Sequence, residues 1–228
     1  MKLQFSLLPH NAPATTAEIE FTRCVIAGWA GRDRDAIEHH IEELEALGVP
    51  RPSSVPLFYR VAAQQLTQDA RVEFIGPDSS GEAEVFIFPH AGEHWLSLAS
   101  DHTDRKLETH SVALSKQICA KPVAKEAWRY DDVADHYDQL ILRSWIMENG
   151  ERVLYQEGPL ASLLPPLDLV RRAFDADGMP EGTGMTCGTV AAIGGIRPAP
   201  SFEMEIEDPV LNRNLRHQYE LEILPIVA

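Results

Sequence analysis

The chain has 228 residues, a formal net charge of −15 and 44% hydrophobic residues. This length is typical of one domain with a buried core, and no biased segment is long enough to indicate disorder. So acidic a surface disfavours nucleic acid and anionic membranes as partners, whereas a small anionic substrate stays compatible, because a local cation can reverse the field inside a pocket.

The cysteines and the N-terminus indicate a reducing compartment. Cys24, Cys119 and Cys187 lie far apart and no Cys-x-x-Cys pair occurs, which argues against a disulfide framework or a structural zinc site. Residues 3–7 alternate between apolar and polar and are cut short by Pro9, so they predict a strand and not a secretory signal. No apolar run reaches the length of a transmembrane helix. We therefore expect a cytoplasmic protein.

A helix is predicted at residues 35–47, after a strand whose apolar centre is residues 24–27. Asp33 or Asp35 can cap the start of this helix, and Gly48 stands where a C′ glycine belongs. The rest of the chain is dominated by short strands. The pattern predicts strands at 57–62 and 70–76, a hairpin with arms at 81–88 and 94–100, a short helix within 161–174, and a final hairpin at 201–225 around Asp208-Pro209. Together with sixteen prolines, these elements indicate a mainly β, α+β fold.

The strand at 81–88 carries two carboxylates where a covered strand should have none. Alternate residues of a strand share a face, so Glu82 and Glu84 lie beside each other, and both faces become apolar toward Phe88. Burying unpaired like charges is costly, and a bound cation would resolve the conflict. The alternative is that the two glutamates form the solvent face of an edge strand, which is the commoner place for glutamate.

The hairpin brings a third carboxylate to the pair. A turn centred on Ala91 places residue 82 opposite residue 100, so Asp101 emerges beside Glu82 at about 5–8 Å. Hard oxygen ligands of this kind suit Mg²⁺, Mn²⁺ or Ca²⁺, with water or substrate completing the coordination. Arg105 and Lys116 follow closely, and each either serves this site by pairing with a carboxylate or an anionic substrate, or is a surface cation.

The predicted helix offers a candidate general base. His40 and Glu43 are three residues apart and share a face near the edge of the apolar stripe of this helix. A histidine braced by a carboxylate can deprotonate a water molecule. The alternative is a solvated helix face with stabilising contacts between residues three apart.

Seven segments, in chain order, carry a family resemblance. They are "AGWAGRDRDAIEHHIEELEALGVPRPSSVPLFYR" (a His-x-x-Glu helix before a Phe-x-Lys strand), "GEAEVFIF" (an E-x-E ligand strand), "SDHTDR" (an Asp-x-Ser/Thr-x-Arg motif), "ALSK" (an active-site lysine), "ENGERVLYQEG" (an Asn-Gly…Gln hairpin), "EGTGMTCG" (a Gly-Thr loop) and "FEMEIEDPVLNRNL" (the terminal stretch). Their order and spacing together resemble the fumarylacetoacetate hydrolase (FAH) superfamily, in one of its divergent branches.

The resemblance implies an α+β, mainly β fold, namely an FAH-like mixed β-roll with few short helices. It implies a single domain over residues 1–228, with a small N-terminal lobe at 1–70 that carries a lid helix and a catalytic β-roll at 71–228. It also implies a homodimer and a divalent cation, Mg²⁺ or Mn²⁺, with Ca²⁺ also compatible. The implied metal ligands are Glu82, Glu84 and Asp101, the catalytic residues His40, Glu43 and Lys116, and the substrate-binding residues Arg60, Arg105 and Thr183.

Three segments depart from the family pattern. The Phe-x-Lys strand appears as Phe58-Tyr59-Arg60, which keeps the charge but changes its reach. The Gly-Thr-Pro loop reads Gly182-Thr183-Gly184 without its proline, and Asp208-Pro209 replaces a glycine region. These changes bear on the substrate more than on the metal.

The reaction that we expect is metal-dependent hydrolysis of a carbon–carbon bond in a small 2-oxo or β-diketo acid, of the acylpyruvate or fumarylacetoacetate type. His40 and Glu43 would then activate water, and Lys116 would stabilise the charge that develops. Decarboxylation of the oxaloacetate type, or hydration or isomerisation of a 2-oxo acid, is the alternative chemistry. A catalytically silent metal- or metabolite-binding protein is a second alternative, and an enzyme with Cys187 as nucleophile is a third.

Overall fold

The protein is built from two sheets that pack face to face. The computed structural model describes residues 1–46, 51–174 and 178–227, without the side chains of residues 40, 43, 44 and 46. The larger sheet has eight strands in the order β2 (Thr15–Glu20), β1 (Lys2–Leu8), β12 (Glu126–Arg129), β9 (Glu93–Ser100), β8 (Ala83–His90), β15 (Thr183–Thr186), β3 (Arg23–Gly28) and β4 (Leu57–Val61). The smaller sheet has five, in the order β14 (Glu151–Pro159), β13 (Ile141–Glu148), β16 (Ser201–Asp208), β17 (Arg213–Leu224) and β6 (Arg71–Ile75).

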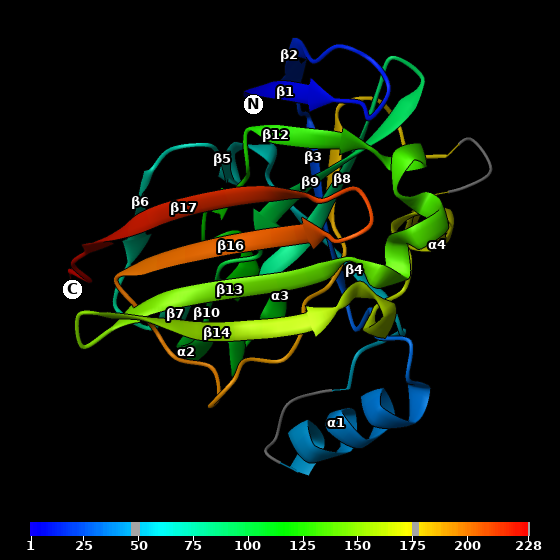
Figure 1. Ribbon diagram of the computed structural model, residues 1–228. Coiled ribbons are helices and arrows are strands. Elements are labelled where there is room, and N and C mark those ends of the chain that lie inside the picture. Colours follow the sequence, from blue (N-terminus) through cyan, green and yellow to red (C-terminus); the bar gives the residue numbers. More distant parts are fainter. Residues whose placement is uncertain (47–50, 175–177, 228) are drawn as a thin grey trace.

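Two pairs of very short strands and a few short helices complete the described fold. The short pairs are β10 (Thr103–Asp104) with β7 (Ser79–Ser80) and β11 (Lys121–Pro122) with β5 (Leu66–Thr67). The α-helices are α1 (Arg34–Ala46), α2 (Arg105–Glu108), α3 (Val112–Gln117) and α4 (Pro166–Ala173). Figure 1 shows the strands of the smaller sheet running side by side, with α1 standing apart from both sheets. No described helix is long and apolar enough to cross a membrane.

The larger sheet curls around a core of its own. One of its faces joins the smaller sheet in a core that includes Val85, Leu98 and Phe202. The opposite face encloses a second core, in which Phe5 of β1 lies 4.6 Å from Phe88 of β8, ring centre to ring centre. Two strands, β12 and β9, separate β1 from β8 in the sheet, so this contact requires the sheet to curl. The expected α+β, mainly β roll is therefore confirmed.

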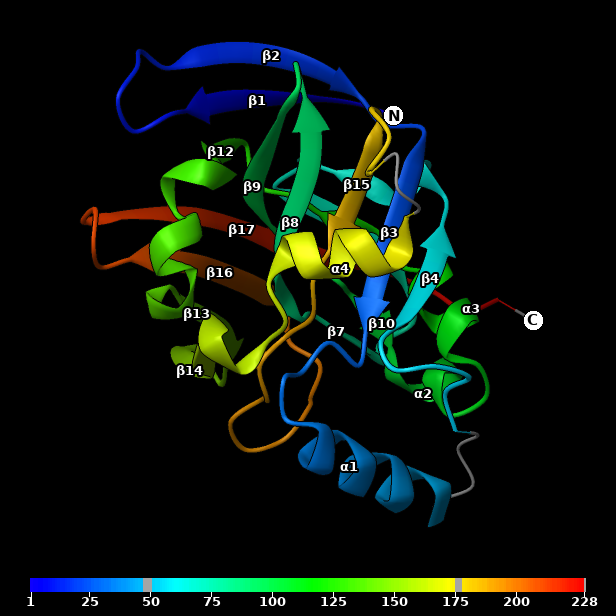
Figure 2. The same cartoon turned by 90° about the vertical axis from the view of Figure 1, so that its right-hand side faces the viewer.

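The predicted elements correspond closely to the observed ones, with two corrections. In the ligand-bearing hairpin, Ser100 pairs with Ala83 and not with residue 82 as expected. The reason is a two-residue turn, in which Ala91 and Gly92 both adopt positive φ. Glu82 is thus directly opposite Asp101. The second correction concerns the segment expected to form a Gly-Thr loop, which is strand β15, between β8 and β3 near the middle of the larger sheet (Figure 2).

Candidate metal centre

Three carboxylates converge where β8 begins and β9 ends. Glu82 directly precedes β8, Glu84 lies on it, and Asp101 directly follows β9. One oxygen from each carboxylate lies within 4.8 Å of those of the other two. The backbone N–H of Asp101 donates to the carbonyl of Glu82 at 2.9 Å, so the ladder of the hairpin itself holds the two side chains together.

The cluster is buried, which excludes the interpretation of an exposed edge strand. Glu84 is 3% exposed and Asp101 1%, and β8 is paired on both sides. Burial, with the charges of Asp101 and Glu82, raises the pKa of Glu84 well above its usual value. Burial would raise the pKa of Asp101 too, but Lys116 and Lys121 outweigh it and hold that pKa below its usual value. The negative charge of its neighbours therefore disfavours the ionised form of Glu84, and a bound cation would reverse this effect.

Helix α3 delivers Lys116 to the cluster. Ser111 caps the start of this helix by accepting a hydrogen bond from Leu114 N, and Lys116 is in its last turn. The ammonium of Lys116 lies 2.5 Å from Asp101 Oδ2 and 3.9 Å from Glu82 Oε2. Burial alone would lower its pKa, but the two carboxylates raise it, so Lys116 is charged at neutral pH. The expected proximity of Lys116 to the ligands is thus what the structure shows.

A second lysine, Lys121, supports the cluster from within the core and was not predicted. It is fully buried, donates to the carbonyls of His102 at 2.5 Å and Lys116 at 2.6 Å, and lies 3.3 Å from Asp101 Oδ1. Its place in the apolar run "ICAKPVA" is the signal that could have identified it, because a lysine among apolar residues is buried only with partners.

Arg105 neutralises a carboxylate, as one of its two predicted roles required. Its guanidinium lies 3.1 Å from Glu82 Oε1 and 2.9 Å from Glu108, and its Nε donates to Ser80 Oγ at 2.7 Å. Asp104, directly before it, caps helix α2 by accepting from Leu107 N. The "SDHTDR" segment thus supplies a ligand candidate, a helix cap and a cation in succession.

The Gly-Thr pair that meets the cluster is Gly188-Thr189 and not Gly182-Thr183. Gly188 N donates to Glu84 Oε2 at 2.8 Å, and Thr189 Oγ1 donates to the carbonyl of Ala83 at 2.7 Å. Because Thr186 pairs with Phe86, Thr183 falls near Pro89, about 17 Å along β8 from Glu84. The second Gly-Thr pair in "MTCGTV" was the missed signal.

On strand β4 it is Tyr59 that faces the cluster, whereas Arg60 does not. Arg60 is exposed and donates to the backbone carbonyls of Cys24 and Thr22, at 3.3 Å each. Tyr59 pairs with Ile26 and so shares a sheet face with the residues around Glu84. The ammonium of Lys116 lies 5.9 Å from the centre of its ring. The alternation of the strand therefore turns the two neighbours to opposite faces.

The predicted dyad lies on helix α1, which begins as expected. Asp33 Oδ1 accepts from the N–H groups of Asp35 and Ala36 at 3.0 Å. The side chains of His40 and Glu43 lie outside the described residues. Their role as a water-activating pair remains a prediction.

Cys187 is a poor nucleophile in this environment. It is 1% exposed, and burial together with the charge of Glu84 raises the pKa of its thiol well above the usual value. The reactive form of cysteine is the thiolate, so this thiol is inert. All three cysteines are free and buried.

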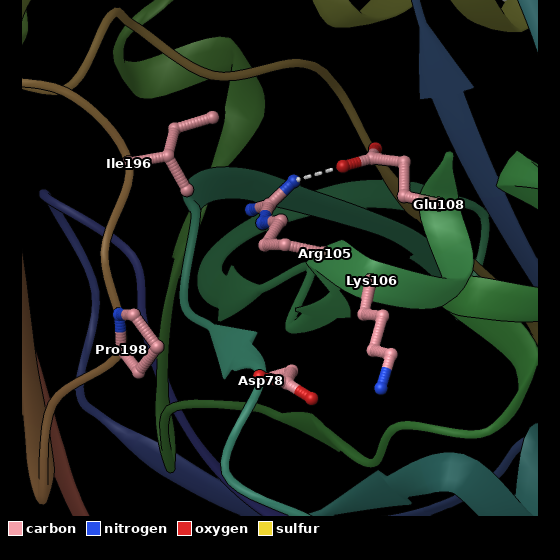
Figure 3. Close-up of a pocket in the computed structure, with 6 residues that line it drawn as sticks. All are labelled: Asp78, Arg105, Lys106, Glu108, Ile196 and Pro198. Atoms are coloured by element: carbon pink, nitrogen blue, oxygen red, sulfur yellow. Dashed lines mark hydrogen bonds and ion pairs between the residues drawn. The ribbon is translucent and has the colours of Figure 1, made fainter.

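Two cavities lie beside the acidic cluster and share Ile196 in their lining. The larger, about 440 Å³, is lined by Asp78, Arg105, Lys106, Glu108, Ile196 and Pro198. Figure 3 shows Arg105 and its partner Glu108 on one side of this cavity, and Ile196 and Pro198 on a loop across from them. The smaller, about 300 Å³, is lined by Glu82 and residues of β14 and the 189–196 segment.

The donor set fits a divalent cation with a preference for oxygen. Three carboxylates offer oxygens at mutual distances suited to one ion. Asp101 Oδ1 is buried and accepts no hydrogen bond among the described residues. It faces the Lys121 ammonium at 3.3 Å, which leaves a lone pair for a cation. No described cysteine or histidine belongs to the cluster, which disfavours zinc.

Sequence comparison gives one family match. A family model described as "Protein of unknown function (DUF2848)" matches residues 27–219. Comparison with curated protein sequences gives no significant match.

Solved structures resemble the chain over most of its length. A yeast protein of the fumarylacetoacetate hydrolase family, ynq8, is 16% identical with a TM-score of 0.61, over 91% of this chain and 95% of that chain. A 2-keto-3-deoxy-D-arabinonate dehydratase complexed with magnesium and 2,5-dioxopentanoate is 11% identical with a TM-score of 0.65, over 92% and 77%. A 4-oxalocrotonate decarboxylase from Pseudomonas putida G7 complexed with calcium and acetate is 15% identical with a TM-score of 0.54, over 87% and 76%. At these identities the likeness establishes the fold alone, and it confirms that the chain has the FAH-like fold.

Proposed function

The chain belongs to the DUF2848 family, and we propose that this member is a divalent-metal-dependent enzyme acting on a small 2-oxo or β-diketo acid. The observation that carries the proposal is the buried convergence of Glu82, Glu84 and Asp101. The fold shared with a magnesium-bound dehydratase and a calcium-bound decarboxylase supports it.

The charge balance of the cluster favours an anionic substrate. Among the described residues, Arg105, Lys116 and Lys121 lie within 4 Å of Glu82 or Asp101, and Arg105 also pairs with Glu108. A divalent cation added to this set leaves a net positive charge, which a carboxylate ligand would neutralise. Mg²⁺ and Mn²⁺ are the ions that we propose, and Ca²⁺ satisfies the same oxygen ligands.

The protein groups divide the remaining work. Glu82, Glu84 and Asp101 would hold the ion, which supplies Lewis-acid polarisation of a bound carbonyl. Lys116 keeps its charge at neutral pH, which supports a role in stabilising the negative charge that would develop on the fragment that leaves. The hydrogen bond from Gly188 N to Glu84 Oε2 holds the carboxylate of this ligand candidate in place.

Within this class we propose hydrolytic cleavage of a carbon–carbon bond, with His40 and Glu43 taking a proton from the attacking water. Without that water, the same charge stabilisation by Lys116 serves decarboxylation, hydration or isomerisation. If His40→Ala leaves turnover intact while Glu84→Gln abolishes it, the reaction is of the lyase type. We also propose that the protein is cytoplasmic and forms a homodimer. Light scattering of the purified protein tests the dimer.

Metal binding is the first test. We expect one Mn²⁺ per chain by isothermal titration calorimetry, and we expect Glu84→Gln to weaken binding at least tenfold while the fold is retained, because the amide keeps the shape of the side chain. Glu73→Gln, on an exposed position of β6, is the matched control.

Activity is the second test, with acylpyruvates and oxaloacetate as substrates of the Mn²⁺-loaded protein. Binding of Mn²⁺ that Glu84→Gln does not weaken would refute the assignment of the site. Specific binding without turnover of any 2-oxo acid would favour a catalytically silent protein.

A further inference from the structure

The smaller cavity meets the acidic cluster at Glu82, one of the three ligand candidates. Its volume is about 300 Å³, and Glu82 forms part of its lining, together with Gly81, Gln156 and Thr189. The rest of the lining is apolar or aromatic: Tyr155, Val190, Ala191, Ala192 and Ile196. A molecule held at the acidic cluster therefore has room to extend a substituent along these side chains.

The polar groups of this cavity are already used by the protein. The Gln156 amide oxygen accepts from Ala83 N at 3.0 Å and Ser144 Oγ at 2.7 Å. Its nitrogen donates to Thr189 Oγ1 at 2.8 Å and to the carbonyl of Val190 at 2.6 Å. No residue of the lining is cationic, so a carboxylate that entered would be left without a partner.

The loop that carries Ile196 is held against Tyr155 by hydrogen bonds. Ile193 N donates to the carbonyl of Tyr155 at 2.7 Å, and Arg197 N donates to the Tyr155 hydroxyl at 3.2 Å. The Arg197 side chain is committed to Glu148 at 2.8 Å and to the carbonyls of Ile193 and Gly195 at 2.9 Å. The one cation of this loop is thus engaged elsewhere, and the apolar wall is fixed.

Ile196 stands at the boundary between the two cavities. It lines both cavities and is 55% exposed. Beyond it, the larger cavity is lined by Arg105 and Lys106, as well as two carboxylates (Figure 3). The larger cavity therefore has cationic side chains beside Ile196, whereas Glu82 is the one charged residue in the lining of the smaller cavity.

We propose that the smaller cavity binds the substituent of the 2-oxo acid, and that this substituent is short, apolar and uncharged. The inference rests on the proposed function, because the oxo-acid end must be held at the acidic cluster. The protein should therefore prefer monocarboxylic 2-oxo acids to dicarboxylic ones such as oxaloacetate, whose second carboxylate would meet Val190, Ala192 and Ile196.

Binding to the Mn²⁺-loaded protein tests this without any need for turnover. Affinities are measured by calorimetry for pyruvate, 2-oxobutanoate and 2-oxopentanoate, and for the dicarboxylates oxaloacetate and 2-oxoglutarate. We expect affinity to rise about threefold per added methylene. We expect 2-oxoglutarate to bind at least tenfold more weakly than 2-oxopentanoate.

Two variants at the boundary sharpen the test. Ile196→Ala should abolish most of the gain with chain length while pyruvate binds as before. Ile196→Lys should raise the affinity for 2-oxoglutarate relative to 2-oxopentanoate at least tenfold. Ile193→Ala is the matched control: it is on the same loop and 48% exposed, it does not line the cavity, and it should behave as the wild type.

The outcomes separate the two proposals. If Mn²⁺ does not bind, the proposed function fails and this inference fails with it. If Mn²⁺ binds but the dicarboxylates bind as well as their apolar counterparts, or Ile196→Ala and Ile193→Ala are equivalent, the inference is overturned and the metal site stands.

Discussion

At the residue scale, the energetics of the centre depend on Lys121, a charge that never reaches solvent. Its ammonium bonds two backbone carbonyls and faces Asp101 at 3.3 Å. Burial lowers its pKa, which Asp101 partly offsets. Removing one member of such a set leaves the others desolvated and unpaired, which costs more than the pair contributes.

We therefore predict that Lys121→Met lowers the free energy of unfolding by about 2–4 kcal/mol. The change removes the donor to the carbonyls of His102 and Lys116 and leaves Asp101 with one cation fewer. Urea unfolding measures it, with Lys125→Met, at an exposed position nearby, as the control. Equal stability of the two variants would show that the buried lysine contributes nothing specific.

Sequence reasoning located the residues that are close along the chain and missed those that the fold brings in. Glu82, Glu84 and Asp101 lie within one hairpin, so strand alternation and a turn were enough to bring them together. Gly188 follows β15 and Lys121 lies on β11, and both reach the cluster through strand pairings between segments far apart in the chain, β15 with β8 and β11 with β5. The resemblance implied Arg60, whereas Tyr59 is the residue on the face of β4 that meets the cluster. Strand alternation separates the two residues but does not tell which face meets the site.

At the element scale, strand β17 braces the ligand hairpin from the other sheet. The Tyr219 hydroxyl donates to Ser100 Oγ at 2.9 Å and bonds His102 Nδ1 at 2.8 Å. Ser100 Oγ in turn accepts from Glu82 N at 3.3 Å, and His102 Nε2 bonds Ser79 Oγ at 3.0 Å. The backbone on either side of two ligand candidates is thereby tied to a strand of the opposite layer.

Tyr219→Phe should loosen this brace without emptying the core. We expect a loss of about 1 kcal/mol of unfolding free energy and a Mn²⁺ affinity several-fold weaker, because the ring is kept while the shared hydroxyl is lost. Tyr137→Phe is the control, since the Tyr137 hydroxyl is buried with no hydrogen-bond partner among the described residues. If both variants bind Mn²⁺ alike, the network has no part in positioning the ligands.

The register of the ligand hairpin shows why element boundaries were harder to predict than the elements. Ala91 adopts φ +55° and Gly92 φ +80°. Asn-Gly announces such a turn, as it does at Asn149-Gly150, where the hairpin was expected and found. Ala-Gly gives no such signal, and the alternation of the two arms alone centres the turn on Ala91, which shifts the predicted pairing by one residue.

At the scale of the whole molecule, the order of motifs predicted the roll, but not how it closes. Phe5, Phe21, Phe86 and Phe88 form one cluster of rings in the smaller core. Phe5, Phe86 and Phe88 are inward residues of their own strands, yet nothing local says that β1 must meet β8. That closure is a property of the curled sheet.

The stability of the protein in acid also depends on a buried histidine outside the acidic cluster. His217 lies on β17, and burial, with the nearby charge of Lys125, lowers its pKa to about 4. The unfolded chain binds a proton at this residue near pH 6.5, whereas the folded chain does so only near pH 4. The stability that the neutral ring provides is therefore complete above pH 6.5, is lost as the pH falls toward 4, and changes no further below it.

We predict that His217→Gln removes this part of the acid sensitivity. Relative to pH 7, the wild type should lose about 2–3 kcal/mol more unfolding free energy at pH 4 than the variant does, which is the pKa difference converted at about 1.4 kcal/mol per unit and reduced for partial exposure. Urea unfolding at pH 7, 5.5 and 4 measures the difference, with His10→Gln at an exposed position as the control. Parallel curves for wild type and His217→Gln would mean that this histidine is protonated in the folded protein as readily as in the unfolded chain.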